Sequence, residues 1–370
     1  MFELDSAVEP VVAIARTHAL DVDRGAFPSQ TVRALGEAGL LGLVSSRDVG
    51  GKECGLPAAA AVVERLAREC GSTAMVVCMH YCATALIEQH GTHDVRKAIA
   101  AGTHLSTLAF SEVGSRSQFW APIGSATRDG DDVVLSARKS FVTSGRHADS
   151  YVWSSKPTVG NELSTLWFVP RATIGLRAGA GFEGLGLRGN DSTAVTAEGA
   201  RVPYSSKLGN DGDGFRIMME LVLPWFNVLA AAVSNGLMEA AVQKTAAHAG
   251  GARFEHAGSS LADLPTIRAY IARMRVATDQ SKALLSETLA AIADGRADAT
   301  LRVLETKAAA GESAAAVCDL AMRVCGGAAF AKDGGVERIF RDARAALVMA
   351  PTTDVLYDFI GKAVCGMPLF

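Results

Sequence analysis

The side chains best suited to catalysis in this sequence are one histidine, one serine and a few carboxylates. His80 stands in the apolar stretch STAMVVCMHYCATALI, where an imidazole either stabilises a developing anion or satisfies backbone groups in the core. Ser111 stands in LAFSEVGSRSQ, among short hydroxyls that can hydrogen-bond a ligand. Glu220, Glu239 and Asp354 are candidate general bases, although a solvent-facing or capping role is favoured for each.

The cysteines and glycines exclude two other kinds of chemistry. The seven cysteines lack CxxC or Cys/His spacing, and most stand among apolar residues, so we predict reduced core thiols and no metal site. The glycine pairs in VGG, CGG and DGG are not followed by the Lys-Ser/Thr that a nucleoside triphosphate loop requires. An ATPase is therefore not expected.

Charge and hydropathy limit the partners and the location. The formal net charge is -3, and no block of basic residues offers a surface for nucleic acid or anionic lipid. The acidic start MFELDSAVEP lacks the basic and apolar regions of a secretory signal. No stretch offers about 20 uninterrupted apolar residues, so no membrane span is expected. These features predict a cytoplasmic protein.

The elements that must position these side chains fall into three blocks, which predict an α+β fold. Residues 1–104 show apolar stripes at helical spacing and predict an N-terminal helical domain. Residues 105–210 contain segments such as DDVVLSARKSFVTSG and STLWFVP, typical of a central antiparallel β-barrel or sandwich layer. In residues 211–370 small residues recur at helical spacing, which predicts a tightly packed C-terminal four-helix bundle. A doubly wound sheet is excluded because strands and helices do not alternate.

This α–β–α order and several local motifs resemble the acyl-CoA dehydrogenase superfamily of flavoproteins over nearly the whole chain. LGEAGLLGLVSSRDVGG resembles the N-terminal helix and turn of that family, LAFSEVGSRSQ its flavin loop, and KSFVTSGRHAD the strand beside the flavin ring. GLGLRGNDSTAVTAEGARVP, MRVCGGAAF and ERIFRDAR follow in the expected order. Each motif is weak alone, and their order carries the resemblance.

The resemblance implies FAD as the cofactor and assigns residues to it by motif position. Ser111 and Thr143 would hydrogen-bond the isoalloxazine, Phe141 and Val142 would pack on it, and Ser117 would lie near the pyrophosphate. Residues of a neighbouring subunit would hold the adenosine diphosphate half, in a homodimer or homotetramer. The full set of implied cofactor-binding residues is Phe110, Ser111, Gly114, Ser117, Phe141, Val142, Thr143, Arg253, Arg323, Gly326, Gly327, Thr352 and Asp354.

The main departure from the family pattern concerns the catalytic base. Where the family has the glutamate that removes the α-proton of the thioester, this chain has Ala350, which cannot accept a proton. Some relatives place the base on the first long helix of the C-terminal bundle, and the matching residue here is Phe226 or Asn227. Trp225 and Phe226 at the start of that helix, with His80 and Ala350, predict a narrowed apolar substrate pocket.

Smaller departures change the charge around the expected dinucleotide. Arg323 and Asp354 each stand where the family usually has glutamine. In the flavin loop, Val113 and Arg116 stand where proline and glycine are common, so the loop is expected to differ in shape.

Three functions stay open. The first is oxidation of an acyl thioester or a related small apolar substrate by an atypical mechanism, with a displaced base such as Asp354 or Glu220 and an electron-transfer flavoprotein as acceptor. The second is a flavin-dependent monooxygenase or oxidase that uses O2 and a flavin reductase. It would work through a flavin C4a-(hydro)peroxide stabilised by His80 and Ser111, without an α-proton base. The third is a non-catalytic subunit that completes the FAD site of a partner chain.

Overall fold

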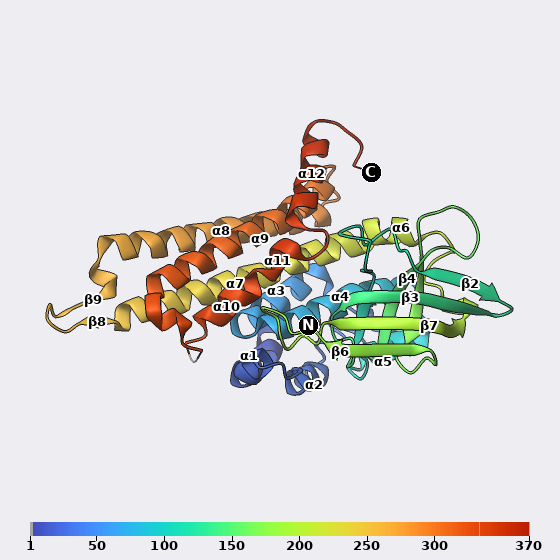
Figure 1. The fold of residues 1–370 in the computed structure, drawn as a ribbon, viewed down its shortest axis with the longest axis horizontal. Coiled ribbons are helices and arrows are strands. Elements are labelled where there is room, and N and C mark those ends of the chain that lie inside the picture. The colour runs from blue at the N-terminus through green and yellow to red at the C-terminus, as the bar shows by residue number, and fades with distance from the viewer. Residues whose placement is uncertain (1–2, 333, 370) are drawn as a thin grey trace.

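The computed structural model describes residues 3–332 and 334–369, with helices at both ends of the chain and strands between them (Figure 1). The N-terminal helices are α1 (Leu4–Asp23), α2 (Ser29–Glu37), α3 (Gly55–Glu69), α4 (Gly71–His90) and α5 (His93–Ala100). α3 buries one apolar face, whereas α4 is buried almost all round because it packs against α3, α7 and β1.

The β layer consists of two sheets that do not close into a barrel. The smaller sheet has the order β1 (Ser106–Ala109), β4 (Ser150–Ser155), β5 (Thr165–Pro170). The larger has the order β2 (Ser125–Asp129), β3 (Asp132–Val142), β7 (Thr193–Pro203), β6 (Leu176–Gly181). The two sheets share a core that includes Leu135, Tyr151, Trp153, Trp167 and Val195.

The expectation of an antiparallel layer is confirmed for the larger sheet and is wrong for one pair of the smaller. β4 and β5 are antiparallel, but β1 and β4 are parallel, with Ser106 opposite Ser150. The chain leaves β1 to form β2 and β3 in the other sheet before it returns to β4. A connection of that length allows the parallel pairing that a tight hairpin forbids.

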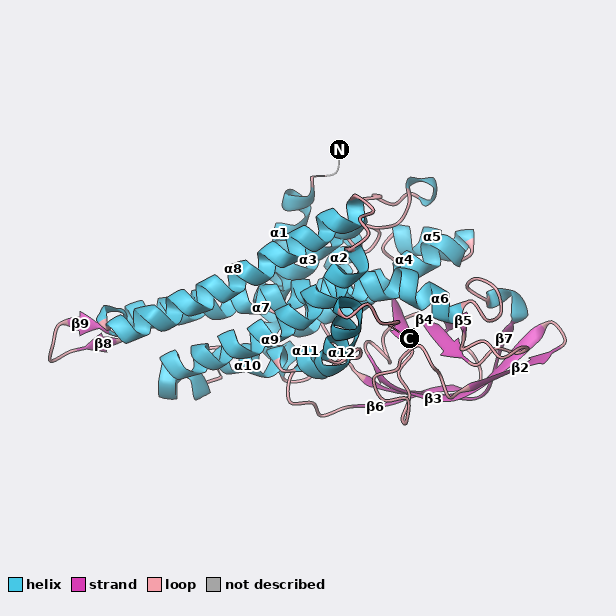
Figure 2. Cartoon of the chain, turned by 90° about the horizontal axis from the view of Figure 1, so that it is seen from above, coloured by secondary structure: helices cyan, strands magenta, loops and turns pink. Residues whose placement is uncertain are grey.

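The C-terminal part is built on long helices that extend away from the strands (Figure 2). After α6 (Gly214–Ile217) and a π-helical stretch η3 (Met218–Val222) come α7 (Leu223–Gly251), the small hairpin β8 (Arg253–Phe254) and β9 (Ser259–Ser260), α8 (Pro265–Ala293) and α9 (Ala299–Cys325). The shorter helices α10 (Val336–Ala343), α11 (Ala345–Val348) and α12 (Thr353–Val364) pack on α9 and complete the C-terminal helical part. Short 3₁₀ turns lie at Arg47–Val49, Tyr204–Ser206, Leu261–Asp263 and Gly326–Phe330.

Two helical stretches, Gly214–Gly251 and Ala299–Phe330, are long and apolar enough to cross a membrane by length and composition alone, although the sequence predicts none. Within their most apolar windows, 72% and 44% of the residues are buried inside the structure. α7 packs against α3, α8 and α9, which accounts for its apolar composition.

Candidate active site

A cavity of about 690 Å³ lies where the β layer meets the helices on both sides of it. Its walls come from α4, from the ends of β1 and β3, from the start of α7, and from the chain after α10. The loop between β6 and β7, residues 182–192, completes it. This volume is ample for a small-molecule site.

The end of β3 presents a hydroxyl and an aromatic ring to the cavity through a break in the sheet register. The pairing of β3 with β7 shifts between Lys139 and Val142, and Phe141 adopts a left-handed φ of 54°. Such irregularities re-aim side chains and are common next to active sites. Thr143, which is 5% exposed, and Phe141, which is 71% exposed, both line the cavity.

A buried ion pair holds the loop that follows β1. Lys139 Nζ lies 2.5 Å from Glu112 Oε1 and donates to the carbonyl oxygen of Ser154 at 2.6 Å. Glu112 Oε2 accepts hydrogen bonds from the backbone amides of Ile123 and Gly124 at 2.7 and 2.8 Å. Burial lowers the pKa of Lys139 to about 8, against the opposing attraction of Glu112. Both oxygens of the Glu112 carboxylate are therefore engaged in structure.

Replacing Lys139 with methionine is expected to lower the free energy of unfolding by about 3–5 kcal/mol, because it leaves the Glu112 carboxylate buried without its counter-ion. Urea unfolding measures the change. The double variant Glu112→Gln/Lys139→Met is the matched control, and it should recover part of the loss because no unpaired charge remains. Equal midpoints for the wild type and the Lys139→Met single variant would show that the pair contributes nothing.

The β6–β7 loop is tied to α10 by two neighbouring residues. The backbone amide of Leu187 donates to Asp342 Oδ1 at 2.6 Å, and Arg341 donates to the carbonyl oxygen of Leu185 at 3.0 Å. Burial raises the pKa of Asp342 to about 6, so this carboxyl is ionised and accepting at neutral pH. The β6–β7 loop forms much of the cavity wall, and these hydrogen bonds to α10 hold it in place.

The segment around Ala350 lines the cavity, and a buried lysine of α9 holds its backbone in place. Lys307 of α9 is 2% exposed, and its Nζ donates to the carbonyl oxygens of Met349 at 3.1 Å and Pro351 at 2.7 Å. The same nitrogen lies 5.8 Å from the ring centroid of Phe226. Burial lowers the pKa of Lys307 to about 7. One buried amino group therefore donates to the two carbonyls on either side of Ala350.

His80 does not face the cavity, which corrects the expectation of a catalytic or substrate-pocket histidine. Its side chain is fully buried, with Nε2 donating to the carbonyl oxygen of Leu41 at 3.1 Å. Nδ1 accepts from the backbone amide of Ser106 at 3.2 Å. Burial lowers its pKa to about 4, so the ring is neutral. His80 joins α4 to β1 and to the chain before α3.

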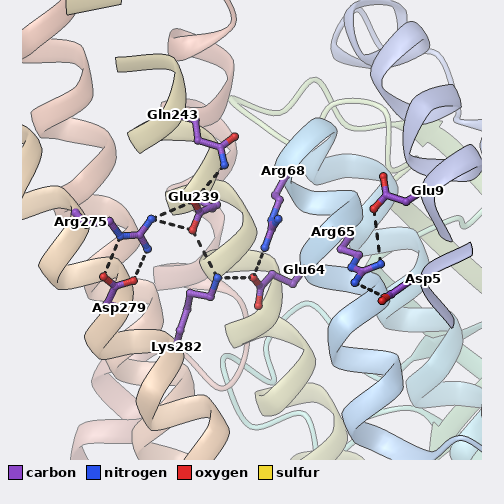
Figure 3. A network of polar contacts seen from close by, with 10 residues as sticks. All are labelled: Asp5, Glu9, Glu64, Arg65, Arg68, Glu239, Gln243, Arg275, Asp279 and Lys282. Atoms are coloured by element: carbon purple, nitrogen blue, oxygen red, sulfur yellow. Dashed lines mark hydrogen bonds and ion pairs between the residues drawn. The ribbon is translucent and has the colours of Figure 1, made fainter. Parts of the chain in front are cut away.

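None of the three candidate carboxylates lines the cavity. Glu239 of α7 pairs with Arg275 and Lys282 of α8, at 3.0 and 3.5 Å, in a network of ion pairs that also reaches α3 (Figure 3). Glu220 pairs with Arg216 at 2.9 Å on an exposed surface. Asp354 is exposed on α12. A displaced carboxylate base at these positions is therefore not supported.

The structure brings most of the residues assigned to the flavin ring into one place. The predicted residues that line the cavity are Phe110, Ser111, Ser117, Phe141, Thr143, Phe226, Ala350 and Thr352. Ser117 Oγ accepts a hydrogen bond from the backbone amide of Thr352 at 2.8 Å, which joins two motifs far apart in sequence.

Three other assigned residues lie outside the lining. The side chain of Val142 is buried in the core of the β layer, and Trp225 packs against the helical core. Gly114 sits on the exposed loop after β1 with φ 100°, a conformation that suits glycine.

The residues assigned to the adenosine diphosphate half lie away from this cavity. Arg253 is on β8, at the end of the long helices that points away from the strands (Figure 1). Arg323, near the end of α9, lies over the ring of Tyr270 near the start of α8, 4.8 Å from its centroid. Gly326 and Gly327 follow α9 and are exposed. A single chain does not bring the two sets together.

The sequence reasoning missed several polar residues of the cavity. Glu112, Arg188, Asn190, Arg341 and Arg344 all line it. All five stood inside motifs that the resemblance uses, and polar or charged side chains within those motifs were the available signal. Lys307 carried no such signal, because a lysine in an Ala-rich helix normally faces solvent.

Comparison with known proteins agrees with this architecture. Residues 5–103 match the family described as acyl-CoA dehydrogenase, N-terminal domain, and residues 212–365 match acyl-CoA dehydrogenase, C-terminal domain. Cyclohex-1-ene-1-carbonyl-CoA dehydrogenase of Geobacter metallireducens is 28% identical, covering 94% of this chain and 92% of the relative.

Two solved structures share the fold. A glutaryl-coenzyme A dehydrogenase in complex with glutaryl-CoA superposes with a TM-score of 0.92 at 24% identity, covering all of this chain and 96% of that one. A prolyl acyl carrier protein oxidase superposes with a TM-score of 0.89 at 19% identity, covering 98% of both.

The cavity of this α–β–α chain collects short hydroxyls and aromatic rings from the β layer and the C-terminal part, and two methionines from α4. The chain belongs to the acyl-CoA dehydrogenase superfamily and is an oxidoreductase of that family.

The cofactor of this family is FAD, as the resemblance implied, and the donor set of the cavity fits it. Ser111 and Thr143 supply hydroxyls suited to a ring edge, and Phe110 and Phe226 supply apolar surface. Arginine side chains in the same lining suit phosphate oxygens.

Proposed function

We propose that this protein is an FAD-dependent oxidoreductase that oxidises an acyl thioester or a related small apolar substrate without a carboxylate base. The observation that carries the proposal is the lining of the cavity. Ala350, which the resemblance aligns with the family's base position, lines the cavity, and Glu112 is the only carboxylate among the described lining residues. Both oxygens of Glu112 are already engaged, by Lys139 and by two backbone amides, which supports a structural role for this carboxylate.

The chain's own residues support binding and orientation rather than proton transfer. Bound FAD would accept two electrons from the substrate. Ser111 and Thr143 would orient the ring, while Met75, Met79 and Phe226 offer apolar contact to an acyl chain. The α-proton would pass to solvent, since exposed residues such as Phe141 and Val348 border the cavity.

The test is to load the protein with FAD, mix it anaerobically with a short-chain or cyclic acyl-CoA, and follow the flavin absorbance across a range of pH. The rate of reduction should be low and should rise steadily with pH, because no lining side chain titrates as a base. A rate that levels off above an apparent pKa typical of a carboxyl group would contradict the proposal. Failure to bind FAD would point to the partner-subunit function instead.

A flavin-dependent monooxygenase or oxidase is the second candidate, and the same base-free lining favours it, since oxygen chemistry needs no α-proton acceptor. The loaded protein is reduced chemically without oxygen, mixed with O2 and followed by absorbance. A transient spectrum that matches neither reduced nor oxidised flavin would establish this function. A direct return to the oxidised spectrum would favour the dehydrogenase, with an electron-transfer flavoprotein as its acceptor.

The oligomeric state belongs to the same proposal. Arg253, Arg323, Gly326 and Gly327 lie away from the cavity of their own chain and are exposed, as expected if they complete the site of a second copy. A homodimer or homotetramer in the cytoplasm is the proposed form, and sedimentation of the FAD-loaded protein measures its size.

A further inference from the structure

We propose that Arg116 and Arg188 form a cationic rim that binds a diphosphate group at the cavity. The inference rests on the proposed function, because it names the chemistry of the cavity's ligand. Arg116 belongs to the loop after β1, and Arg188 belongs to the loop between β6 and β7. Both side chains line the same cavity and both are exposed, so an anion can reach them from solvent.

The cavity carries more positive charge than its own residues compensate. Four arginines line it, and the lining carboxylate, Glu112, is neutralised by Lys139. Arg341 is compensated by Asp23 at 2.7 Å and by Glu337 at 2.6 Å. The positive charge that remains belongs to the other three arginines.

Arg116, Arg188 and Arg344 differ in the contacts that their side chains make with other residues. Arg344 lies over the Phe340 ring at 4.5 Å and is 3.8 Å from Asp319. The side chains of Arg116 and Arg188 make no hydrogen bond or ion pair with any residue from 3 to 369 that the structure describes. A guanidinium presents a planar pair of donors that matches phosphate oxygens, which makes these two the available anion ligands.

Neutral donors lie beside the two arginines. Asn190 is 6% exposed and lines the cavity. Its Oδ1 accepts from the backbone amide of Ser192 at 3.0 Å, so its amide nitrogen stays a donor. Ser117, next to Arg116 in sequence, lines the cavity as well. Guanidinium and amide donors from two loops together suit a group with several anionic oxygens.

The backbone at Arg116 supports a functional reason for this side chain. Its φ is 44°, in the left-handed region that favours glycine, and glycine is common at this position in the resembling family. A non-glycine residue held there costs of order 1 kcal/mol or more, and such outliers gather at functional sites.

Two ligands carry a diphosphate, FAD itself and the coenzyme A part of a substrate, and calorimetric titration separates them. The variants are Arg116→Gly, whose new residue suits φ 44°, and Arg188→Gln. Arg33→Gln, an exposed change on α2, is the charge-matched control. The probes are inorganic pyrophosphate and FAD on the apoprotein, and coenzyme A and pantetheine on the FAD-loaded protein.

Each cavity variant is expected to weaken pyrophosphate binding about tenfold, the effect of one charge-assisted hydrogen bond. If the rim holds FAD, FAD binding weakens equally and coenzyme A binding does not. If it holds the substrate, coenzyme A binding weakens while FAD and pantetheine binding stay unchanged.

The inference is overturned if wild-type protein binds no pyrophosphate, or if both variants behave like Arg33→Gln. These measurements need no turnover, so they stand apart from the test of the redox reaction. If the protein does not oxidise acyl-CoA but the two variants still weaken pyrophosphate binding, the proposed function is refuted and the diphosphate site is retained.

Discussion

Replacing Ala350 with glutamate is expected to speed the reduction of FAD by an acyl thioester by about 10²–10⁴-fold, the usual effect of a positioned general base. Ala350 lines the cavity, so a longer side chain there would reach the space that a substrate occupies. The carbonyls on either side of residue 350 are held by Lys307, which gives the new carboxylate a fixed attachment. Anaerobic stopped-flow absorbance measures the rate.

Ala350→Gln is the matched control, because glutamine has nearly the shape of glutamate and cannot accept the proton. The glutamate variant should also show a rate that levels off above the pKa of its carboxyl group, unlike the wild type. Equal rates in the two variants would mean that the missing base does not limit acyl thioester oxidation. The oxygen-dependent function would then be the better explanation of the cavity.

Replacing Lys307 with methionine is expected to lower the free energy of unfolding by about 2–4 kcal/mol, because the carbonyls of Met349 and Pro351 lose their donor. The loss should depend on pH. Burial lowers the pKa of Lys307 from 10.5 to about 7, so between these values the unfolded chain binds more protons than the folded chain. Wild-type stability therefore gains a contribution as pH rises from about 7 to 10.5, and the variant lacks it.

Urea unfolding of both proteins at several pH values tests this prediction. The stability difference should be smallest near neutral pH and should widen toward alkaline pH. Lys139 also has a lowered pKa, but both proteins contain this residue. Its contribution to the pH dependence of stability therefore cancels when the two proteins are compared. Lys97→Met, at an exposed position on α5, is the control, and its difference from the wild type should not change with pH in this way. A pH-independent loss for Lys307→Met would mean that the lysine is already charged in the folded protein.

The order of the parts was predictable from sequence because it depends on local signals. Apolar residues at helical spacing and β-branched or aromatic runs report on a few neighbouring residues at a time. The resemblance of the motifs around Ser111, Thr143 and Ala350 to those of the family predicted that these residues share one site, and all three line the cavity. The resemblance alone assigns the family's base position to Ala350, and an alanine side chain cannot accept a proton.

Only the tertiary structure decided which charged and polar residues act inside that cavity. Lys139 contacts Glu112, which is 27 residues away in the sequence, and Lys307 contacts Pro351, which is 44 residues away. Local periodicity predicts neither contact. Likewise, only the approach of Leu41 and Ser106 shows that both nitrogens of His80 are engaged. Burial and pairing depend on which distant segments pack together, and this packing sets the protonation state and the accessibility of each group.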